Sequence, residues 1–172
     1  MSYVLSLAAL VLGTLPSLLK GKNMKLILLL LCIGNFFVTV SYVLDGGFNG
    51  AAASIMGVVC TLINFILEVK NKPVPKALVA FYIVLSVVVN LWVSKGVDLY
   101  MLLVAGAGVA FHISTTRKNG RDYRFWILFN LLLWCVYDIV SASYSVLITH
   151  GIQLLTNVFG MIVHDRKKEI QN

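Results

Sequence analysis

Polar side chains recur at helical spacing inside long apolar runs of this 172-residue chain. Asn130, Trp134 and Tyr137 follow one another at i, i+4 and i+7. Asn35 and Tyr42 have the same i, i+7 spacing as Asn130 and Tyr137. Residues at this spacing share one face of a helix. An amide beside an aromatic ring can orient and stack a small polar solute, so both faces are candidate binding surfaces. Packing between helices is the simpler alternative, especially for Trp134.

A second pair of polar stripes lies on two other runs. His150, Gln153 and Asn157 fall at i, i+3 and i+7, and Asn64 ends a similar face of an earlier run. By the helical rise, Asn157 lies roughly 16 Å below the end of its run, near the middle of a membrane-spanning helix. Asparagine offers a donor and an acceptor without charge, which favours uncharged hydroxyl-bearing or amide-bearing ligands over ions. Hydrogen bonds to neighbouring helices are the alternative.

Asp138 and His150 are titratable residues close to the ends of two consecutive apolar runs. Each lies about four residues, or roughly 6 Å, below the same end of its run, so the two side chains could meet. Such a pair could act as a gate or a proton-linked switch, because histidine changes charge near neutral pH. A hydrogen bond without a transport role is the alternative. His112 has no obvious partner, and we expect it at the membrane interface.

The composition places these residues in a membrane. Hydrophobic residues make up 59% of the chain and charged residues 12%, which is too apolar for a soluble globular domain. A membrane-spanning helix needs about 20 residues, so the chain can supply seven crossings and no soluble catalytic domain. The apolar runs predict spans near residues 3–19, 26–43, 51–69, 77–93, 99–115, 125–142 and 146–163.

The distribution of positive charge predicts the orientation. Thirteen of the fourteen lysines and arginines fall in alternate loops and the C-terminal tail, and only Lys95 falls on the other side. The positive-inside rule then places the N-terminus outside and the C-terminus inside. Orientation explains the net charge of +7, so we expect no nucleic-acid partner. The first apolar run has no basic region before it and is interpreted as a retained span.

Several chemistries are not expected. Cys32, Cys60 and Cys135 lie in apolar runs without a CxxC pair or histidine at metal spacing, so they are interpreted as small buried residues and no metal site is predicted. The sequence has no motif of a metalloprotease, a serine hydrolase or a phosphate-binding loop. The last span has no lysine for a retinal Schiff base. We therefore expect neither an enzyme nor a cofactor.

A weak internal repeat relates the two halves of the chain. A shift of 95 residues superposes Asn35 on Asn130 and Tyr42 on Tyr137, and a shift of 93 superposes Asn64 on Asn157. Asparagine is costly in a hydrocarbon core, so these pairs outweigh matched leucines. The repeat predicts an all-α integral membrane protein with seven transmembrane helices in a 3+1+3 order. Its parts are two parallel three-helix units, 1–70 and 99–168, a linker at 71–98 that contains the fourth helix, and a tail at 169–172.

This layout, with an asparagine in the third helix of each unit, resembles the SWEET, SemiSWEET and PQ-loop transporters. Within that group the chain is most similar to the YgjV-type bacterial inner-membrane proteins. Three stretches carry the resemblance: Gly50-Ala-Ala-Ala-Ser-Ile55 running on to Asn64, Leu133-Trp-Cys-Val-Tyr137, and Leu154-Leu-Thr-Asn157 followed by the basic His164-Asp-Arg-Lys-Lys168.

The resemblance implies a multi-pass carrier of the bacterial inner membrane, and the chemistry of the asparagines favours a small, neutral polar metabolite as its solute. It would work by alternating access around a midplane site, as a single chain or a homodimer, with the lipid bilayer and the solute as partners. In SWEET-type transporters the third-helix asparagines bind substrate, which implies this role for Asn64 and Asn157. Prolines form the hinges of that group, and Pro16 is the candidate here, although Ser17 follows it where the group has glutamine. A non-transporting membrane scaffold or accessory subunit is the alternative.

Overall fold

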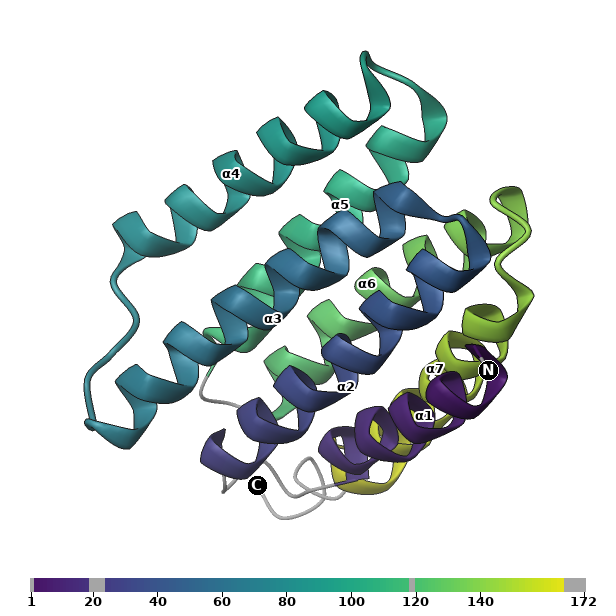
Figure 1. The fold of residues 1–172 in the computed structure, drawn as a ribbon. Helices are drawn as coiled ribbons and strands as arrows, with labels where there is room; N and C mark the ends of the chain where they lie inside the picture. The colour runs from purple at the N-terminus through teal and green to yellow at the C-terminus, as the bar shows by residue number, and fades with distance from the viewer. Residues whose placement is uncertain (1, 19–23, 118–119, 166–172) are drawn as a thin grey trace.

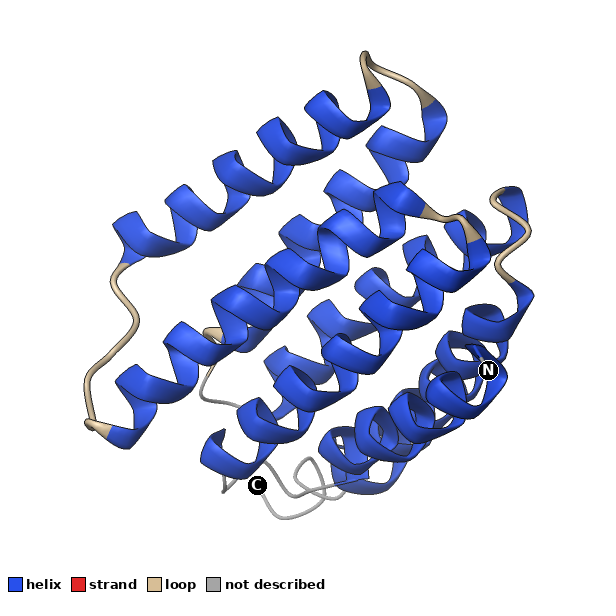
Figure 2. Ribbon diagram, viewed as in Figure 1, coloured by secondary structure: helices blue, strands red, loops and turns tan. Residues whose placement is uncertain are grey.

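The computed structural model describes residues 2–18, 24–117 and 120–165, and it contains helices and no strands in these ranges (Figure 1, Figure 2). Each predicted span coincides with one helix, so the all-α prediction is confirmed. The helices are α1 (Ser2–Leu18), α2 (Met24–Asp45), α3 (Phe48–Val69), α4 (Lys76–Ser94), α5 (Leu99–Thr115), α6 (Gly120–Val140) and α7 (Tyr144–Asp165).

The described helices have the length and surface of membrane spans. Five of them, α2, α3, α4, α6 and α7, are long and apolar enough to cross a membrane. The other two, α1 and α5, are apolar and have 17 residues each. Large apolar side chains point outward along the bundle, including Trp92 at 80% exposed and Leu155 at 70%. An apolar outer surface of this extent matches contact with lipid rather than with water.

Six helices form two layers that enclose the centre of the molecule (Figure 1). One layer consists of α1, α2 and α3, and the other consists of α5, α6 and α7. The layers join at their edges, where α1 packs against α7 and α3 packs against α5. The seventh helix, α4, lies outside the two layers and packs against α3 and α5.

The two ends of the bundle differ in charge and in their connections. One end holds the α3–α4 loop and the segment after α5, with Lys70, Lys72, Lys76 and Arg117, and we call it the basic end. The opposite end, here the turn end, holds the short α2–α3 and α6–α7 turns. Gly46 opens the α2–α3 turn with a φ of 78°, a conformation that glycine adopts without strain.

Small residues allow α1 and α7 to approach closely. A Cβ atom added at Gly160 of α7 would lie only 2.6 Å from the main-chain oxygen of Ser17 of α1. Nearer the turn end, Thr149 Oγ1 donates a hydrogen bond of 2.8 Å to the main-chain oxygen of Ser6. Close backbone approach and hydroxyl hydrogen bonds are typical of helix pairs in membranes. This seam therefore holds the two layers together along one edge.

Candidate functional site

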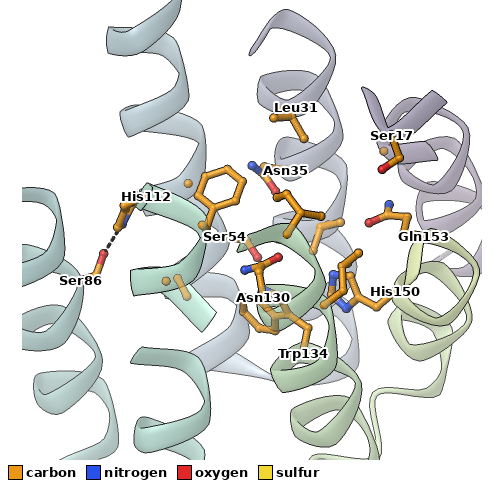
Figure 3. A pocket seen from close by; sticks show the side chains of 18 of the residues that line it. Ser17, Leu31, Asn35, Ser54, Ser86, His112, Asn130, Trp134, His150 and Gln153 are labelled. Carbon is orange, nitrogen blue, oxygen red and sulfur yellow. Dashed lines mark hydrogen bonds between the residues drawn. The ribbon is translucent and has the colours of Figure 1, made fainter. Parts of the chain in front are cut away.

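A cavity lies between the two layers, and all seven described helices contribute to its wall (Figure 3). Its volume, measured for the centres of water-sized molecules, is about 60 Å³. A single water needs about 10–15 Å³ on this measure, so the cavity could hold about four to six waters. The polar residues of the wall are Ser17, Asn35, Ser54, Ser86, Asn90, His112, Tyr123, Asn130, His150 and Gln153.

Asn35 of α2 and Asn130 of α6 face this cavity from opposite layers. The Asn130 side chain donates a hydrogen bond of 2.9 Å to the main-chain oxygen of Ala107, which fixes the orientation of its amide. The Asn35 Nδ2 atom is buried and has no hydrogen-bond partner among the described residues. A Cβ atom at Gly57 would lie 3.2 Å from this Nδ2, so the glycine leaves room for the amide. An unpaired buried donor beside a cavity is a ready contact for a ligand.

An aromatic surface forms another part of the wall. The rings of Trp134 and His150 are stacked, with centroids 5.4 Å apart and an angle of 24° between their planes. Gln153, one turn further along α7, donates a hydrogen bond of 3.3 Å to the main-chain oxygen of Ala9. The cavity thus combines a flat ring surface with uncharged amides, which suits recognition of a small polar molecule.

Asp138 is fully buried at the turn end of the cavity. Its two carboxylate oxygens have separate partners, since His150 Nδ1 lies 2.7 Å from Oδ2 and the Tyr42 hydroxyl donates to Oδ1. The structure therefore brings Asp138 and His150 into contact, as their spacing suggested, and adds Tyr42 from the other layer. Nearby, the Tyr137 hydroxyl accepts a hydrogen bond of 2.8 Å from the main-chain nitrogen of Gly50. These bonds join the two layers across α2, α3, α6 and α7.

Apolar clusters bound the cavity toward both ends of the bundle. Toward the turn end, Val38 and Tyr42 of α2 pack with Trp134 and Tyr137 of α6. Toward the basic end lies a second cluster with members from α2, α5 and α6, namely Ile27, Phe111, Tyr123, Ile127 and Leu131. The cavity thus lies between two apolar clusters, some of whose members line it.

Asn64 and Asn157 do not line the cavity. Asn64 donates a hydrogen bond of 3.3 Å to Thr115 Oγ1 and accepts one of 3.3 Å from the Tyr82 hydroxyl. Asn157 accepts a hydrogen bond of 3.4 Å from the Ser17 hydroxyl and donates one of 2.9 Å to a main-chain oxygen of α6. Each asparagine bonds to a hydroxyl near the C-terminal end of a helix in the opposite layer. Their contacts in this structure are between helices.

The sequence interpretation missed the contribution of α4 and α5. The expectation that His112 lies at the interface without a partner is wrong, because its side chain is buried and its Nε2 lies 2.7 Å from Ser86 Oγ. Ser86 and Asn90 of α4 line the cavity with it. The signal was present in the sequence, since Tyr82, Ser86 and Asn90 are spaced four residues apart and share one helix face.

Pro16 lies in the last turn of α1, and its side chain is buried. Its role as a hinge stays a prediction. The three cysteines are free thiols, with Cys60 buried and Cys32 and Cys135 half-buried, which agrees with their interpretation as small residues of the bundle. The described residues hold no group of three or more potential metal ligands.

Comparisons with known proteins agree with the membrane character of the fold. Neither the search of curated proteins nor the search of solved structures finds a match. A family model named Imp-YgjV, described as a bacterial inner membrane protein, matches residues 1–168. The apolar helices of spanning length fit a multi-pass protein of that membrane. With nearly the whole chain matched, the protein belongs to the Imp-YgjV family of bacterial inner membrane proteins.

Proposed function

We propose that this protein is a carrier for a small, uncharged polar solute, which binds in the central cavity between Asn35 and Asn130. The observation that carries the proposal is a polar cavity enclosed by helices whose outer surface is apolar. Polar groups are costly within a membrane and commonly mark substrate pathways there. The Nδ2 atom of Asn35 is in addition a buried hydrogen-bond donor without an acceptor among the described residues.

The wall of the cavity defines the class of solute. Beside apolar side chains it contains amides, hydroxyls and histidine rings, and none of the described residues that line it is an aspartate, glutamate, lysine or arginine. A buried ion without an opposite charge would be strongly disfavoured, whereas a hydroxyl or amide can pair with asparagine in both directions. The Trp134 ring, stacked against His150, is an apolar part of the wall that can contact the carbon skeleton of the solute. A small polyol or amide fits the present volume, and a larger solute requires the layers to separate.

Transport would proceed by alternating access between the two halves of the chain. In this proposal α1–α3 and α5–α7 are parallel three-helix units, α4 links them, and all seven helices cross the membrane. In support, α1 packs against α7 as α3 packs against α5, which is the pairing expected if the units are related by a pseudo-twofold axis. The two apolar clusters are then the barriers that open in turn. By the positive-inside rule the basic end faces the cytoplasm.

The aspartate network at the turn end is the proposed outer gate. Opening that end requires separation of Asp138 and His150 in one layer from Tyr42 in the other. Such a network closes the site when its bonds are formed and releases it when they break. The resemblance to SWEET-type transporters, which also rock two three-helix units, supports this mode of action.

A ligand screen with matched variants tests the proposal. Thermal unfolding of the purified protein is followed with neutral sugars, polyols, amides, nucleosides and vitamins, for the wild type, Asn35→Leu and Asn157→Leu. A ligand at 100 times its Kd should stabilise the folded state by about 2.7 kcal/mol when unfolding is reversible. We expect Asn35→Leu to reduce this stabilisation by about 0.5–1.5 kcal/mol, because the substitution removes one neutral hydrogen-bond donor from the cavity wall. Asn157→Leu serves as the control and should retain it, since Asn157 lies outside the cavity.

The alternative function is that of a scaffold or accessory subunit, in which the polar residues only connect helices. It predicts that no compound stabilises the wild type. A panel in which no compound stabilises the wild type would therefore replace the carrier function by the scaffold function.

A further inference from the structure

We propose that α4 is part of the binding site and not a passive linker: Ser86 and Asn90 of α4, with His112 of α5, form a polar arm of the central cavity. In this arm a hydroxyl or amide group of the solute binds, while another polar group of the same solute lies between Asn35 and Asn130. The inference rests on the carrier function proposed above, because it extends the same cavity.

Every buried residue of α4 carries a side chain that can form hydrogen bonds. In this helix only Tyr82, Ser86 and Asn90 are buried, and their spacing of four residues places them on one face. Most other residues of α4 are apolar and are half-buried or exposed, with Val84 61% and Val88 54% exposed. A helix that only connected two units would be expected to bury apolar side chains, because unpaired polar groups cost free energy in the membrane interior.

Two of the polar atoms in this arm lack partners. Asn90 is fully buried and donates a hydrogen bond of 2.8 Å to the main-chain oxygen of Ser86, but its Oδ1 has no partner among the described residues. His112 is 1% exposed and contacts Ser86 Oγ through Nε2, but its Nδ1 likewise has no partner there. Both residues line the same cavity as Asn35 and Asn130. A ligand group in this position would satisfy atoms that the protein leaves unpaired.

The arm selects its ligand group by hydrogen-bond direction. Asn90 Oδ1 accepts a hydrogen bond, so the ligand must donate one there. His112 Nδ1 donates or accepts according to its tautomer. A hydroxyl or a primary amide can meet both requirements, whereas a carboxylate cannot donate. An ammonium would find no carboxylate in the cavity wall. The solute is therefore uncharged and carries at least two polar groups.

Two glycines line the cavity close to its polar side chains. Gly108 of α5 lines the cavity beside Ser86, and a Cβ atom at this glycine would lie 3.7 Å from Ser86 Cβ. On the other side, Gly57 of α3 lines the cavity next to Asn35. Gly57 and Gly108 add no side chain to the cavity wall on α3 and α5, the two helices against which α4 packs.

Cysteine reactivity tests whether the arm is hydrated. The full-length protein, with its three native cysteines replaced by alanine, receives Ser86→Cys, Val88→Cys or Ser54→Cys and is reconstituted in lipid vesicles. The probe is methyl methanethiosulfonate, which is small and uncharged and reacts with thiolates. A thiol in contact with lipid stays protonated, whereas one beside water ionises. We therefore expect Ser86→Cys to react at least about tenfold faster than Val88→Cys, its lipid-facing neighbour on the same helix.

The cysteine at Ser54 separates failure of the arm from failure of the carrier site. Ser54 lines the central cavity on α3. If Ser54→Cys reacts quickly and Ser86→Cys reacts no faster than Val88→Cys, the arm is overturned and the central site stands. If neither cavity position reacts faster than Val88→Cys, the carrier site is lost together with the arm.

Ligand affinity tests whether the arm binds the solute. In the thermal-unfolding screen of polyols and amides, Asn90→Leu should bind a stabilising compound about three- to tenfold more weakly than the wild type, the loss expected for one neutral hydrogen bond. Asn157→Leu, which changes a buried asparagine outside the cavity, should leave the Kd unchanged. Equal Kd values for Asn90→Leu and the wild type would overturn the arm as a binding site.

Discussion

The seam between α1 and α7 provides a sharp test of the packing, through Gly160→Ala and its control Gly151→Ala on the same helix. A Cβ atom at Gly160 would lie 2.6 Å from the main-chain oxygen of Ser17, whereas a Cβ atom at Gly151 would meet nothing within 4 Å. The first contact is with backbone, which cannot rotate away as a side chain can. Helix α1 must therefore move away from α7 in Gly160→Ala.

The expected free energies follow from two opposing effects. Replacing glycine by alanine within a helix stabilises it by about 0.5–1 kcal/mol, and both variants gain this amount. Insertion of a methyl group into a close contact costs about 1–3 kcal/mol. Gly151→Ala should therefore be slightly more stable than the wild type. Gly160→Ala should be less stable than Gly151→Ala by about 1–3 kcal/mol, the cost of the contact alone.

Reversible unfolding in mixed micelles, driven by a denaturing detergent, measures this difference. Comparison of two alanine variants of one helix cancels the change in helix propensity, so that the remaining difference reports the seam. Equal stability of Gly160→Ala and Gly151→Ala would show that α1 and α7 do not approach as closely as the structure has them. The close contact at Gly160 would then not be what holds the two layers together at this edge.

Three further predictions follow from the buried polar contacts. Asp138→Ala leaves the partners of a buried carboxylate unpaired and should destabilise the protein by about 3–5 kcal/mol in the same unfolding assay; a loss below 1 kcal/mol would contradict the network with His150. Asn64→Leu should lower the free energy of unfolding by about 1–3 kcal/mol, because two hydroxyl groups lose their hydrogen-bond partner. Asn35→Leu should lower it by less, since Asn35 Nδ2 has no partner among the described residues. The reverse order would be inconsistent with the assigned contacts. Gly57→Ala places a Cβ 3.2 Å from Asn35 Nδ2 and should weaken ligand-induced stabilisation while the protein stays folded; an unchanged Kd would argue against a ligand at Asn35.

Local sequence determined the helices. Apolar runs long enough to cross a hydrocarbon core are interrupted by Gly, Pro, Asn and charged residues, and each predicted span became one helix. This information is local because a backbone surrounded by lipid must satisfy its hydrogen bonds within the segment. The spacing of Asp138 and His150 also sufficed to suggest their contact, since two antiparallel helices joined by a short turn place residues of equal depth side by side.

The roles of the four paired asparagines were decided by tertiary structure. Asn35, Asn64, Asn130 and Asn157 are chemically identical and lie in similar apolar helices, so their type and spacing do not rank them, and the resemblance to SWEET-type transporters favoured Asn64 and Asn157. Packing of the layers turned Asn35 and Asn130 toward the cavity, and it turned Asn64 and Asn157 toward helices of the opposite layer. Whether a helix face lines the cavity or packs against another helix depends on the helices that surround it.

The position of α4 shows the same limit. The sequence contains its polar stripe, and Ser86 meets His112 of the next helix, yet the cavity that these residues line also takes its wall from helices distant along the chain. Periodicity determines which residues share a face, because that depends on the geometry of a single helix. The partner of that face depends on how seven helices divide the space between them, and only the folded bundle decides it.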